Sequence, residues 1–388
     1  MLLLLVGIIF AFLSFLVMEI FLIRKMINAF KHRIIINGTR GKSTVVQYIH
    51  AGLSSQYDSE TNKKTGYCLG KITGVIPALL LPNGESKKIN RRGGARVQEQ
   101  FRAIFYASKL KVDNIVFECM SINPELQKLE SKILQPTVYV ITNIKKDHYE
   151  QMGKDLTEQV KSICEAIPYN SIVVTGAVEH IDVINQTAKL RNTKVIVPEF
   201  ASSSLQYKER NIELALEVCI QASVTKEVAY ERIIKRSKSI STRIFVLPNN
   251  SKFIDGFAVN DVPSAELFIE HWRGEFPELN KLVIVLNSRN DRPLRTLVFA
   301  KWFASADRIN TTNLILIGNH VPFLHYKLLK SGFDKNKIVV WKKRDIKNVY
   351  LLFEKLNLSH SLVVGLGNIA DEGFRFINAL ERGNDFRV

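Results

Sequence analysis

The amino-acid sequence predicts an α/β fold built on a mostly parallel sheet, and three observations predict it. Apolar runs rich in β-branched residues alternate with amphipathic stretches along most of the chain. A glycine-containing turn joins the first such run to a helix-like segment, as in phosphate-binding α/β proteins. The chain has 388 residues, of which 46% are hydrophobic, so it is long enough for two or three domains.

The apolar runs that are short and bounded by turn residues are expected to be strands: 34–37, 114–118, 137–142, 171–175, 194–197, 252–258, 281–286, 313–317, 337–341 and 361–365. The amphipathic stretches between them are expected to be helices, for example 95–110, 154–166, 211–222, 293–305 and 370–382. The stretch 57–94 is rich in Gly, Lys, Asn and Pro and has little periodicity, so we expect a long functional loop there.

The N-terminus is apolar and is followed by basic residues. Residues 1–18 carry no charge, and the apolar character continues past Glu19 to Ile23. About 23 residues suffice to cross a bilayer core of ~30 Å as a helix, so residues 1–23 are expected to be a transmembrane anchor. Residues 24–33 read as a basic juxtamembrane linker, which predicts a single-pass protein of the cell membrane with its catalytic domains in the cytoplasm. A buried helix of a soluble protein is the alternative.

The formal net charge is +17, which fits several kinds of anionic partner. The Lys and Arg residues are scattered and no basic motif is interleaved with aromatic residues, so we expect no nucleic acid partner. A membrane surface, a nucleotide or an acidic substrate explains the charge equally well. The four cysteines show no close spacing and are expected to be reduced thiols without zinc.

The segment G-T-R-G-K-S-T at residues 38–44 has the layout of a phosphate-binding loop, because it lies between a predicted strand and a predicted helix. Its spacing is contracted relative to the usual pattern. Backbone amides and the helix N-terminus would hold phosphate, Lys42 would reach the outer phosphates, and Ser43 or Thr44 would contact magnesium. ATP and Mg²⁺ are therefore the expected cofactors. The residues assigned to the nucleotide here are Gly38, Thr39, Arg40, Gly41, Lys42, Ser43 and Thr44.

Polar residues follow two other apolar runs. Glu118 ends the run 114–118, and Asn143 and the pair Asp147-His148 follow the run 137–142. The carboxyl ends of parallel strands meet at one edge of a sheet, where ligands bind. Carboxylate and hydroxyl oxygens suit Mg²⁺, whereas His is a less usual ligand, so a surface Asp-His pair remains the alternative for residues 147 and 148.

Four motifs taken together carry a family resemblance: G-T-R-G-K-S-T, E-C-M-S-I-N-P, N-I-K-K-D-H-Y-E-Q-M-G and I-P-Y-N. From about residue 34 to the C-terminus the sequence resembles the ligase subunit of bacterial poly-γ-glutamate synthases, in the Mur ligase family that also includes folylpolyglutamate synthases. The resemblance implies a central ATP-binding Mur-ligase domain at 34–247 and a C-terminal Rossmann-like ligase domain at 248–388.

The resemblance also implies a reaction. A γ-carboxylate attacks the γ-phosphate of ATP to give an acyl phosphate, and the amino group of glutamate then forms an amide that extends the poly-γ-glutamate chain. Small membrane subunits of a synthase and export complex are implied partners, and a homo-oligomer stays open. The alternatives are a ligase of the same family with another acceptor, and a membrane-tethered P-loop kinase or ATPase that regulates polymer export.

Site residues are carried over where this sequence matches the family's motifs. Glu118, His148 and Thr73 would contact metal, Asn211 would read adenine and Arg243 would contact phosphates. Asp255 would hold the ribose, and Asn260 would line the nucleotide site. The segment F-I-D-G-F-A-V-N-D at residues 253–261 stands where the family has D-D-Y-A-H-N-P, and Val259 and Asp261 replace the His and Pro of that motif. Asn211 could instead be a helix N-cap and Asp255 a turn residue.

Two further sets of residues are candidates for catalysis or substrate binding. Arg289, Asp291, Arg292 and Asn368 follow predicted strands of the C-terminal domain and could bind the polymer end or the incoming amino acid. Several Mur ligases carry a carbamylated lysine near the position of Lys161, which would help to hold a second magnesium near His148. That role needs a desolvated amine, and a solvated lysine on an amphipathic helix is the simpler interpretation.

Overall fold

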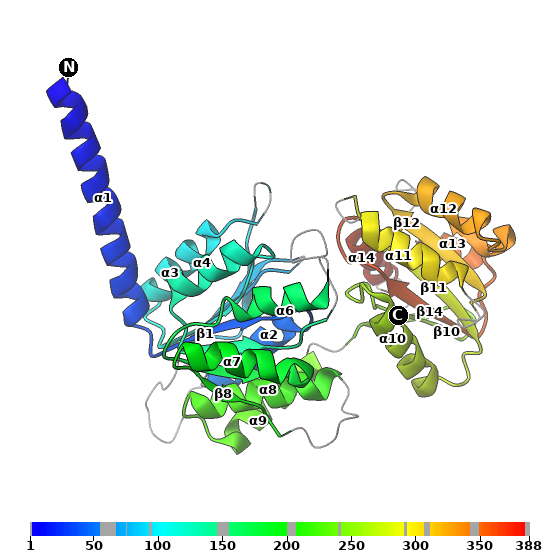
Figure 1. Ribbon diagram of the computed structural model, residues 1–388. Coiled ribbons are helices and arrows are strands. Elements are labelled where there is room, and N and C mark those ends of the chain that lie inside the picture. Colours follow the sequence, from blue (N-terminus) through cyan, green and yellow to red (C-terminus); the bar gives the residue numbers. More distant parts are fainter. Residues whose placement is uncertain are drawn as a thin grey trace. The chain divides into compact units, whose positions relative to one another are not determined.

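The computed structural model describes residues 2–54, 67–74, 76–91, 93, 95–145, 155–199, 207–239, 242–290, 293–305, 311–341 and 349–384. The chain divides into two compact units, residues 1–240 and 241–388. Each unit contains its own sheet with helices packed against it (Figure 1).

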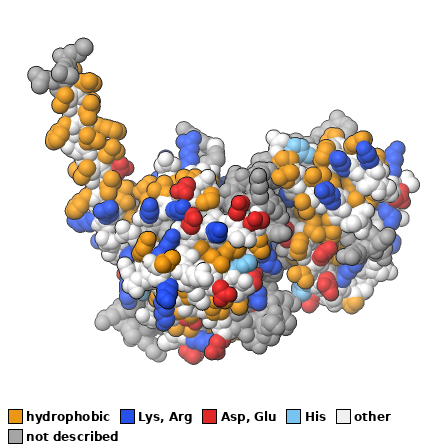
Figure 2. Space-filling model, in the orientation of Figure 1, with side chains coloured by type: hydrophobic (Ala, Val, Ile, Leu, Met, Phe, Trp, Pro, Cys, Tyr) orange, Lys and Arg blue, Asp and Glu red, His pale blue; other side chains and the backbone are white. Residues whose placement is uncertain are grey.

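Helix α1 (Leu2–Asn28) begins the first unit. Its segment Leu4–Asn28 has a mean hydropathy of 2.7 and is long and apolar enough to cross a membrane. Figure 2 shows hydrophobic side chains along α1 and Lys and Arg side chains at its base. The expected linker 24–33 is not a separate segment, because α1 continues to Asn28 and strand β1 begins at His32. Ile27 and Phe30 are buried in the core of the unit, so the last turn of α1 and the residues after it pack against the sheet domain.

The first unit contains an eight-stranded sheet in the order β4-β3-β2-β5-β1-β6-β7-β8. The strands from β2 to β8 in this order run parallel, whereas β3 is antiparallel to both β2 and β4. The strand bounds are β1 (His32–Asn37), β2 (Cys68–Ile72), β3 (Ala78–Leu80), β4 (Ser86–Lys88), β5 (Asn114–Glu118), β6 (Val138–Ile141), β7 (Ile172–Thr175) and β8 (Lys194–Ile196).

The expectation of one long loop at 57–94 was wrong, because β2, β3 and β4 lie within it. Strands β3 and β4 have three residues each, and all three residues of β4 are exposed. Such short strands at a sheet edge carry too few alternating positions to give a periodic signal.

Helices cover both faces of this sheet. Alternate residues of β1 serve the two faces: Ile35 belongs to one hydrophobic cluster, and Ile34 and Ile36 belong to the other. The first cluster lies under α3, α4, α6 and α7, and the second under α2, α8 and α9. The helix bounds are α2 (Lys42–Leu53), α3 (Gln98–Lys109), α4 (Pro124–Leu134), α6 (Leu156–Cys164), α7 (Ile181–Leu190), α8 (Tyr207–Gln221) and α9 (Lys226–Ser239).

The second unit contains a six-stranded sheet in the order β13-β12-β11-β14-β10-β9, parallel except for β9. Because β9 pairs with β10, the second unit begins before the expected position of 248. Its strands are β9 (Ile244–Leu247), β10 (Ser251–Ile254), β11 (Lys281–Ser288), β12 (Asn313–Gly318), β13 (Ile338–Val340) and β14 (Ser361–Leu366). Its helices are α10 (Val262–Glu275), α11 (Pro293–Ala304), α12 (Val321–Lys330), α13 (Val349–Lys355) and α14 (Glu372–Asn384).

Candidate nucleotide and metal site

The turn between β1 and α2 has a backbone that requires glycine at two positions. Gly38 has φ 117°, and a Cβ there would collide with the side chain of Thr142 and the carbonyl of Asn143. Gly41 has φ 78°, and a Cβ there would lie 2.9 Å from Oδ1 of Asn211. Both conformations are strained for other residues, so the glycines allow the chain to turn tightly into α2.

The residues that follow β6 hold this turn in place. The Asn143 carbonyl accepts a hydrogen bond from the Thr39 amide at 2.9 Å, and its side-chain Oδ1 accepts one from the Arg40 amide at 3.1 Å. The Thr142 hydroxyl donates to the Arg40 carbonyl at 2.6 Å. The amides of Thr39 and Arg40, which were expected to contact phosphate, are therefore engaged with the protein itself.

The N-terminus of α2 fits an anion. Helix α2 begins at Lys42, and its N-cap residue Gly41 provides no side-chain hydrogen bond. The first amides of a helix lack partners within the helix, and the helix dipole favours negative charge at this end. The Lys42 amine donates to the Gly38 carbonyl at 2.7 Å, so it folds back across the turn and lies over the same helix end. Lys42 and α2 therefore offer one concentrated positive site.

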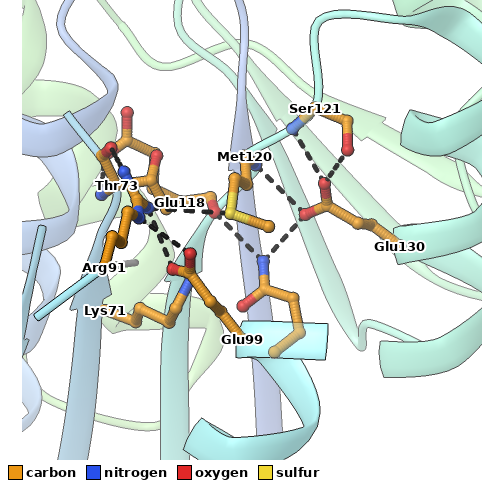
Figure 3. A network of polar contacts seen from close by, with 9 residues as sticks. Lys71, Thr73, Arg91, Glu99, Glu118, Met120, Ser121 and Glu130 are labelled. Carbon is orange, nitrogen blue, oxygen red and sulfur yellow. Dashed lines mark hydrogen bonds and ion pairs between the residues drawn. The ribbon is translucent and has the colours of Figure 1, made fainter. Parts of the chain in front are cut away.

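Glu118, at the end of β5, lies beside this helix end. Its Oε2 accepts a hydrogen bond from the Ser43 hydroxyl at 2.7 Å. The same oxygen accepts one from the Thr73 amide at 2.8 Å (Figure 3). Only 5% of Glu118 is exposed. The contact of Thr73 with Glu118 is made by its backbone and not by the hydroxyl to which the metal role was assigned. His148 lies outside the described residues, so its expected contact has no structural counterpart here.

A hydroxyl and a carboxylate beside a phosphate site suit Mg²⁺, which uses few protein ligands and several waters or phosphate oxygens. Within the described ranges no cluster of three or more His, Cys, Asp or Glu side chains could hold a metal by itself. Ser43 and Glu118 therefore fit a metal ion that the phosphates also bind.

A buried ionic network supports the Thr73 segment. Arg91 donates to Glu99 through two N–H groups at 2.7 and 2.9 Å, and it also donates to the Thr73 carbonyl at 3.3 Å. The Lys71 amine lies 3.8 Å from Glu99 and is fully buried. Burial lowers the pKa of Lys71 to about 8, although the charge of Glu99 opposes this shift. The backbone of Thr73 is thus held at its carbonyl by Arg91 and at its amide by Glu118 (Figure 3).

A second buried carboxylate fixes the backbone beyond Glu118. Glu130 accepts hydrogen bonds from the Gln100 side chain at 2.8 Å, the Met120 amide at 3.1 Å and the Ser121 amide at 2.8 Å. The Ser121 hydroxyl also donates to it. Sequence reasoning missed the residues of both networks, because no local spacing connects Lys71, Arg91, Glu99, Gln100 and Glu130.

Asn211 lies against the phosphate-binding turn. It belongs to α8, which begins at Tyr207, so the alternative that Asn211 caps this helix is wrong. It is 7% exposed, and its side chain covers the Cα of Gly41. Asn211 therefore lies beside the helix end that would bind phosphate. Its contact with adenine remains a prediction. Thr44 lies in the first turn of α2 with Ser43.

Lys161 lies on α6, and its side chain is exposed. The expected role needs a desolvated amine close to the metal site, and the exposed side chain of Lys161 does not meet this requirement. The structure therefore agrees with the simpler interpretation, a solvated lysine on an amphipathic helix.

In the second unit, Arg243 forms ion pairs with two carboxylates. Its guanidinium lies 2.8 Å from Asp255 and 2.8 Å from Glu381. Burial raises the pKa of Asp255, although the neighbouring charge of Arg243 opposes the shift. Asp255 follows β10, and Asn260 lies in the loop before α10. The predicted contacts of Arg243 with phosphate and of Asp255 and Asn260 with the nucleotide remain predictions.

Arg289 and Asn368 line a cavity of about 10 Å³ at the ends of β11 and β14. A space of that size holds about one water molecule, so it is not a preformed amino-acid pocket. The Asn368 side chain accepts a hydrogen bond from the Ala370 amide at 2.7 Å, as in a turn. Asp291 and Arg292 lie outside the described residues.

Two family models match the chain. The Mur ligase middle domain matches residues 36–232, and the C-terminal domain of poly-gamma-glutamate synthase CapB matches residues 245–383. The two matches correspond to the two sheets and together include the phosphate-binding turn, Glu118 and Asn211.

Two curated proteins are similar over long stretches. "PGA synthase CapB" of Bacillus subtilis is 29% identical over 365 residues, which cover 89% of each chain. "Capsule biosynthesis protein CapB" of Bacillus anthracis is 32% identical over 294 residues, which cover 72% of this chain and 61% of the relative. The aligned part therefore spans less than two thirds of the B. anthracis protein.

A solved structure shares the fold. The bifunctional folylpolyglutamate synthase/dihydrofolate synthase of Yersinia pestis, complexed with AMPPNP and a Mn ion, superposes with a TM-score of 0.65 at 12% identity. The match covers 95% of this chain and 92% of that one. With a family model that spans half of its length, the chain belongs to the Mur ligase family and carries the C-terminal domain of poly-gamma-glutamate synthase CapB.

Proposed function

We propose that this chain is an ATP-dependent amide ligase that extends poly-γ-glutamate. A γ-carboxylate of the acceptor attacks the γ-phosphate of ATP, which gives an acyl phosphate and ADP. The amino group of an incoming glutamate then displaces phosphate and forms the amide. The observation that carries the proposal is the convergence of Lys42, the N-terminus of α2 and the Ser43–Glu118 pair at one sheet edge, in a chain similar to a PGA synthase over 89% of its length.

The positively charged helix end answers the main electrostatic requirement of this reaction. The transferring phosphoryl group and the attacking carboxylate are both anionic, so the protein must neutralise charge and hold the reactants in line. Lys42 and the first amides of α2 would bind the phosphates, and Asn211 would lie beside the nucleotide. Gly41 allows the close approach of the backbone that this binding needs.

Ser43 and Glu118 would hold magnesium between the protein and the phosphates. Magnesium neutralises charge on the transferring phosphate when it is bound. The hydrogen bond between Ser43 and Glu118 already brings these two oxygen donors to 2.7 Å. The Mn ion and AMPPNP in the Y. pestis relative support a divalent metal and a nucleotide at a site of this fold.

Helix α1 would anchor the enzyme in the cell membrane, with both sheet-containing units in the cytoplasm. The apolar segment and the Arg24, Lys25 and Lys31 that follow it support this orientation. ATP is available on that side. Small membrane subunits that export the polymer would be natural partners, because the product is a long polyanion made at the membrane surface.

Membranes from cells that express the chain test the proposal when they are incubated with ATP, Mg²⁺ and one labelled amino acid at a time. Labelled glutamate should enter an acid-precipitable polymer in step with ADP formation, and membranes that carry Lys42→Ala should show neither. Incorporation of a different amino acid, or ADP formation without any amide product, would contradict it.

A further inference from the structure

A basic pocket of about 790 Å³ opens between the β3–β4 hairpin and α3 in the first unit. Lys87 and Lys88 come from β4, Arg91 and Arg96 from the segment before α3, and Arg102 from α3 itself. The volume lies within the usual range for small-molecule sites. Apart from Arg91, these side chains have no part in the nucleotide and metal site described above.

Among the described residues, most of the positive charge in this pocket has no carboxylate partner. Glu99 is the one carboxylate among the described residues that line it, and it already binds Arg91 and lies near Lys71. Within the described part of the chain, no carboxylate forms an ion pair with Lys88, Arg96 or Arg102. Several cations that line one concave surface repel one another and attract anions. The pocket therefore suits a ligand with several negative charges.

Arg91 connects the pocket to the nucleotide and metal site. It lines the pocket, and it donates to the Thr73 carbonyl at 3.3 Å. The amide of the same residue, Thr73, donates to Glu118 (Figure 3). Glu118 also accepts a hydrogen bond from Ser43. A ligand that fills the pocket would therefore have one end close to Glu118, where a carboxylate would meet the γ-phosphate of ATP.

We propose that this pocket binds the last residues of the acceptor poly-γ-glutamate chain through their α-carboxylates and directs the terminal γ-carboxylate toward Glu118. A γ-linked chain keeps one free carboxylate on every residue, so a row of cations can bind it at regular intervals. The guanidinium groups of Arg96 and Arg102 suit carboxylates because each offers a planar pair of donors. The pocket has this role only if the chain extends poly-γ-glutamate, as proposed above.

Other polyanions fit the pocket less well. A single-stranded nucleic acid would need an open aromatic face for base stacking, but the Lys87 amine lies 5.1 Å from the centre of the Tyr106 ring and covers that face. An anionic lipid headgroup would explain the positive charge, but it would not explain the link from Arg91 to Thr73 and Glu118. The acceptor chain accounts for both the charge and the link.

Direct binding tests the pocket independently of catalysis. The full-length protein in detergent is titrated with a short fluorescent γ-glutamyl oligomer, and the double variant Arg96→Glu, Arg102→Glu is compared with Lys109→Glu, Lys189→Glu. Both double variants change the net charge equally, but Lys109 and Lys189 are exposed and do not line the pocket. We expect the pocket variant to bind the oligomer at least about tenfold more weakly and the control to stay within about threefold of the wild type.

The remaining measurements separate the pocket from the proposed function. In both double variants ADP binding should match that of the wild type, which shows that the fold is intact. If the wild-type protein binds the oligomer through Arg96 and Arg102 but forms no amide, the pocket is a binding site for γ-glutamyl chains, and the proposed ligase function fails. If it is active, the pocket variant should raise the KM for the oligomer and leave the KM for ATP unchanged.

Three results would overturn the pocket assignment. The first is an unchanged affinity of the pocket variant for the oligomer; if that variant also lost capture by immobilised phosphatidylglycerol, the pocket would be a lipid site. The second is an equal loss of affinity in the control variant, which would mean that net charge alone attracts the oligomer. The third is tighter binding of a single-stranded oligonucleotide of equal charge that depends on the same two arginines.

Discussion

Glu118 and Glu130 are two buried carboxylates near the end of β5, and the same substitution should affect them in opposite ways. In Glu118 only Oε2 accepts hydrogen bonds, from the Ser43 hydroxyl and the Thr73 amide, among the residues that the structure describes. In Glu130 each oxygen accepts two: Oε1 from the amide and hydroxyl of Ser121, and Oε2 from Gln100 and the Met120 amide.

Glu118→Gln can keep both hydrogen bonds, because the amide oxygen can take the place of Oε2 and turn the NH₂ group to the other side. Two charge-assisted bonds become neutral ones, which should lower the free energy of unfolding by roughly 1 kcal/mol. Glu130→Gln has no such orientation, since the NH₂ group must face the backbone amide of Met120 or that of Ser121 whichever way it turns. At least one backbone N–H then loses its acceptor in a buried site, which should cost roughly 2 kcal/mol or more.

The effect on magnesium should be reversed. A unit charge 4 Å from another contributes about 4 kcal/mol at an effective dielectric constant near 20, and Glu118→Gln removes that charge from the expected metal position. Losing only about 1.4 kcal/mol of this attraction would raise the Mg²⁺ concentration at half-maximal activity tenfold. Glu130→Gln removes no group that faces the metal, so its folded fraction should keep the wild-type midpoint.

Two assays on the purified full-length variants separate these effects: urea unfolding at neutral pH, and ATP turnover as a function of free Mg²⁺. We expect a small stability loss with a large midpoint shift for Glu118→Gln, and a large stability loss without a midpoint shift for Glu130→Gln. An unchanged Mg²⁺ midpoint and maximal rate in Glu118→Gln would assign Glu118 a structural role and refute this reasoning.

Three further predictions concern the phosphate loop, the N-terminal helix and a buried histidine. Lys42→Ala should lower ATP turnover at least about 100-fold, because the Lys42 amine lies over the helix end that would bind phosphate. The melting temperature should stay close to that of the wild type. Near-normal turnover in a folded variant would exclude a role of Lys42 in phosphate binding. Deletion of residues 1–22 should release the protein from membranes with its fold intact. Deletion of residues 1–28 should also lower the free energy of unfolding by several kcal/mol, about 2 kcal/mol of it from the buried Ile27. Membrane fractionation and urea unfolding check both, and equal stability of the two truncated proteins would contradict the packing of α1 on the core. Burial lowers the pKa of His50 to about 4 from its usual 6.5, so the unfolded chain binds the proton first and stability falls as the pH drops from 6.5 to 4. Urea unfolding at pH 7 and pH 4 should show that the free energy of unfolding falls by ~3 kcal/mol in the wild type but not in His50→Gln. An equal loss in both proteins would mean that other groups cause it.

The parts of the site that could be predicted from the sequence are those encoded in a few consecutive residues. The turn at 38–44 combines a strand, two glycines, a lysine and a helix start, and Glu118 ends an apolar run. Since β5 and β6 flank β1 in parallel, the residues after these strands meet at one edge, as the alternation of strands and helices predicted.

The support around that site could not be predicted, because it depends on contacts between distant segments. Lys71 lies on β2, which becomes the neighbour of β5, and Glu99 comes from α3. Arg91 reaches both Glu99 and Thr73 only after the β3–β4 hairpin has formed. No spacing in the sequence relates these three residues. The polar stretch 57–94, which contains β2, β3 and β4, was therefore predicted to be one long loop.

The fate of one oxygen atom tests the central claim most directly. If the acceptor γ-carboxylate is labelled with ¹⁸O and incubated with the enzyme, ATP, Mg²⁺ and glutamate, the carboxylate oxygen that attacks the γ-phosphate leaves with the phosphate when the amide forms. An acyl-phosphate ligase therefore predicts ADP and inorganic phosphate that carries ¹⁸O, in equal amounts with new amide bonds. Unlabelled phosphate alongside amide formation, or AMP and pyrophosphate as the nucleotide products, would contradict the account.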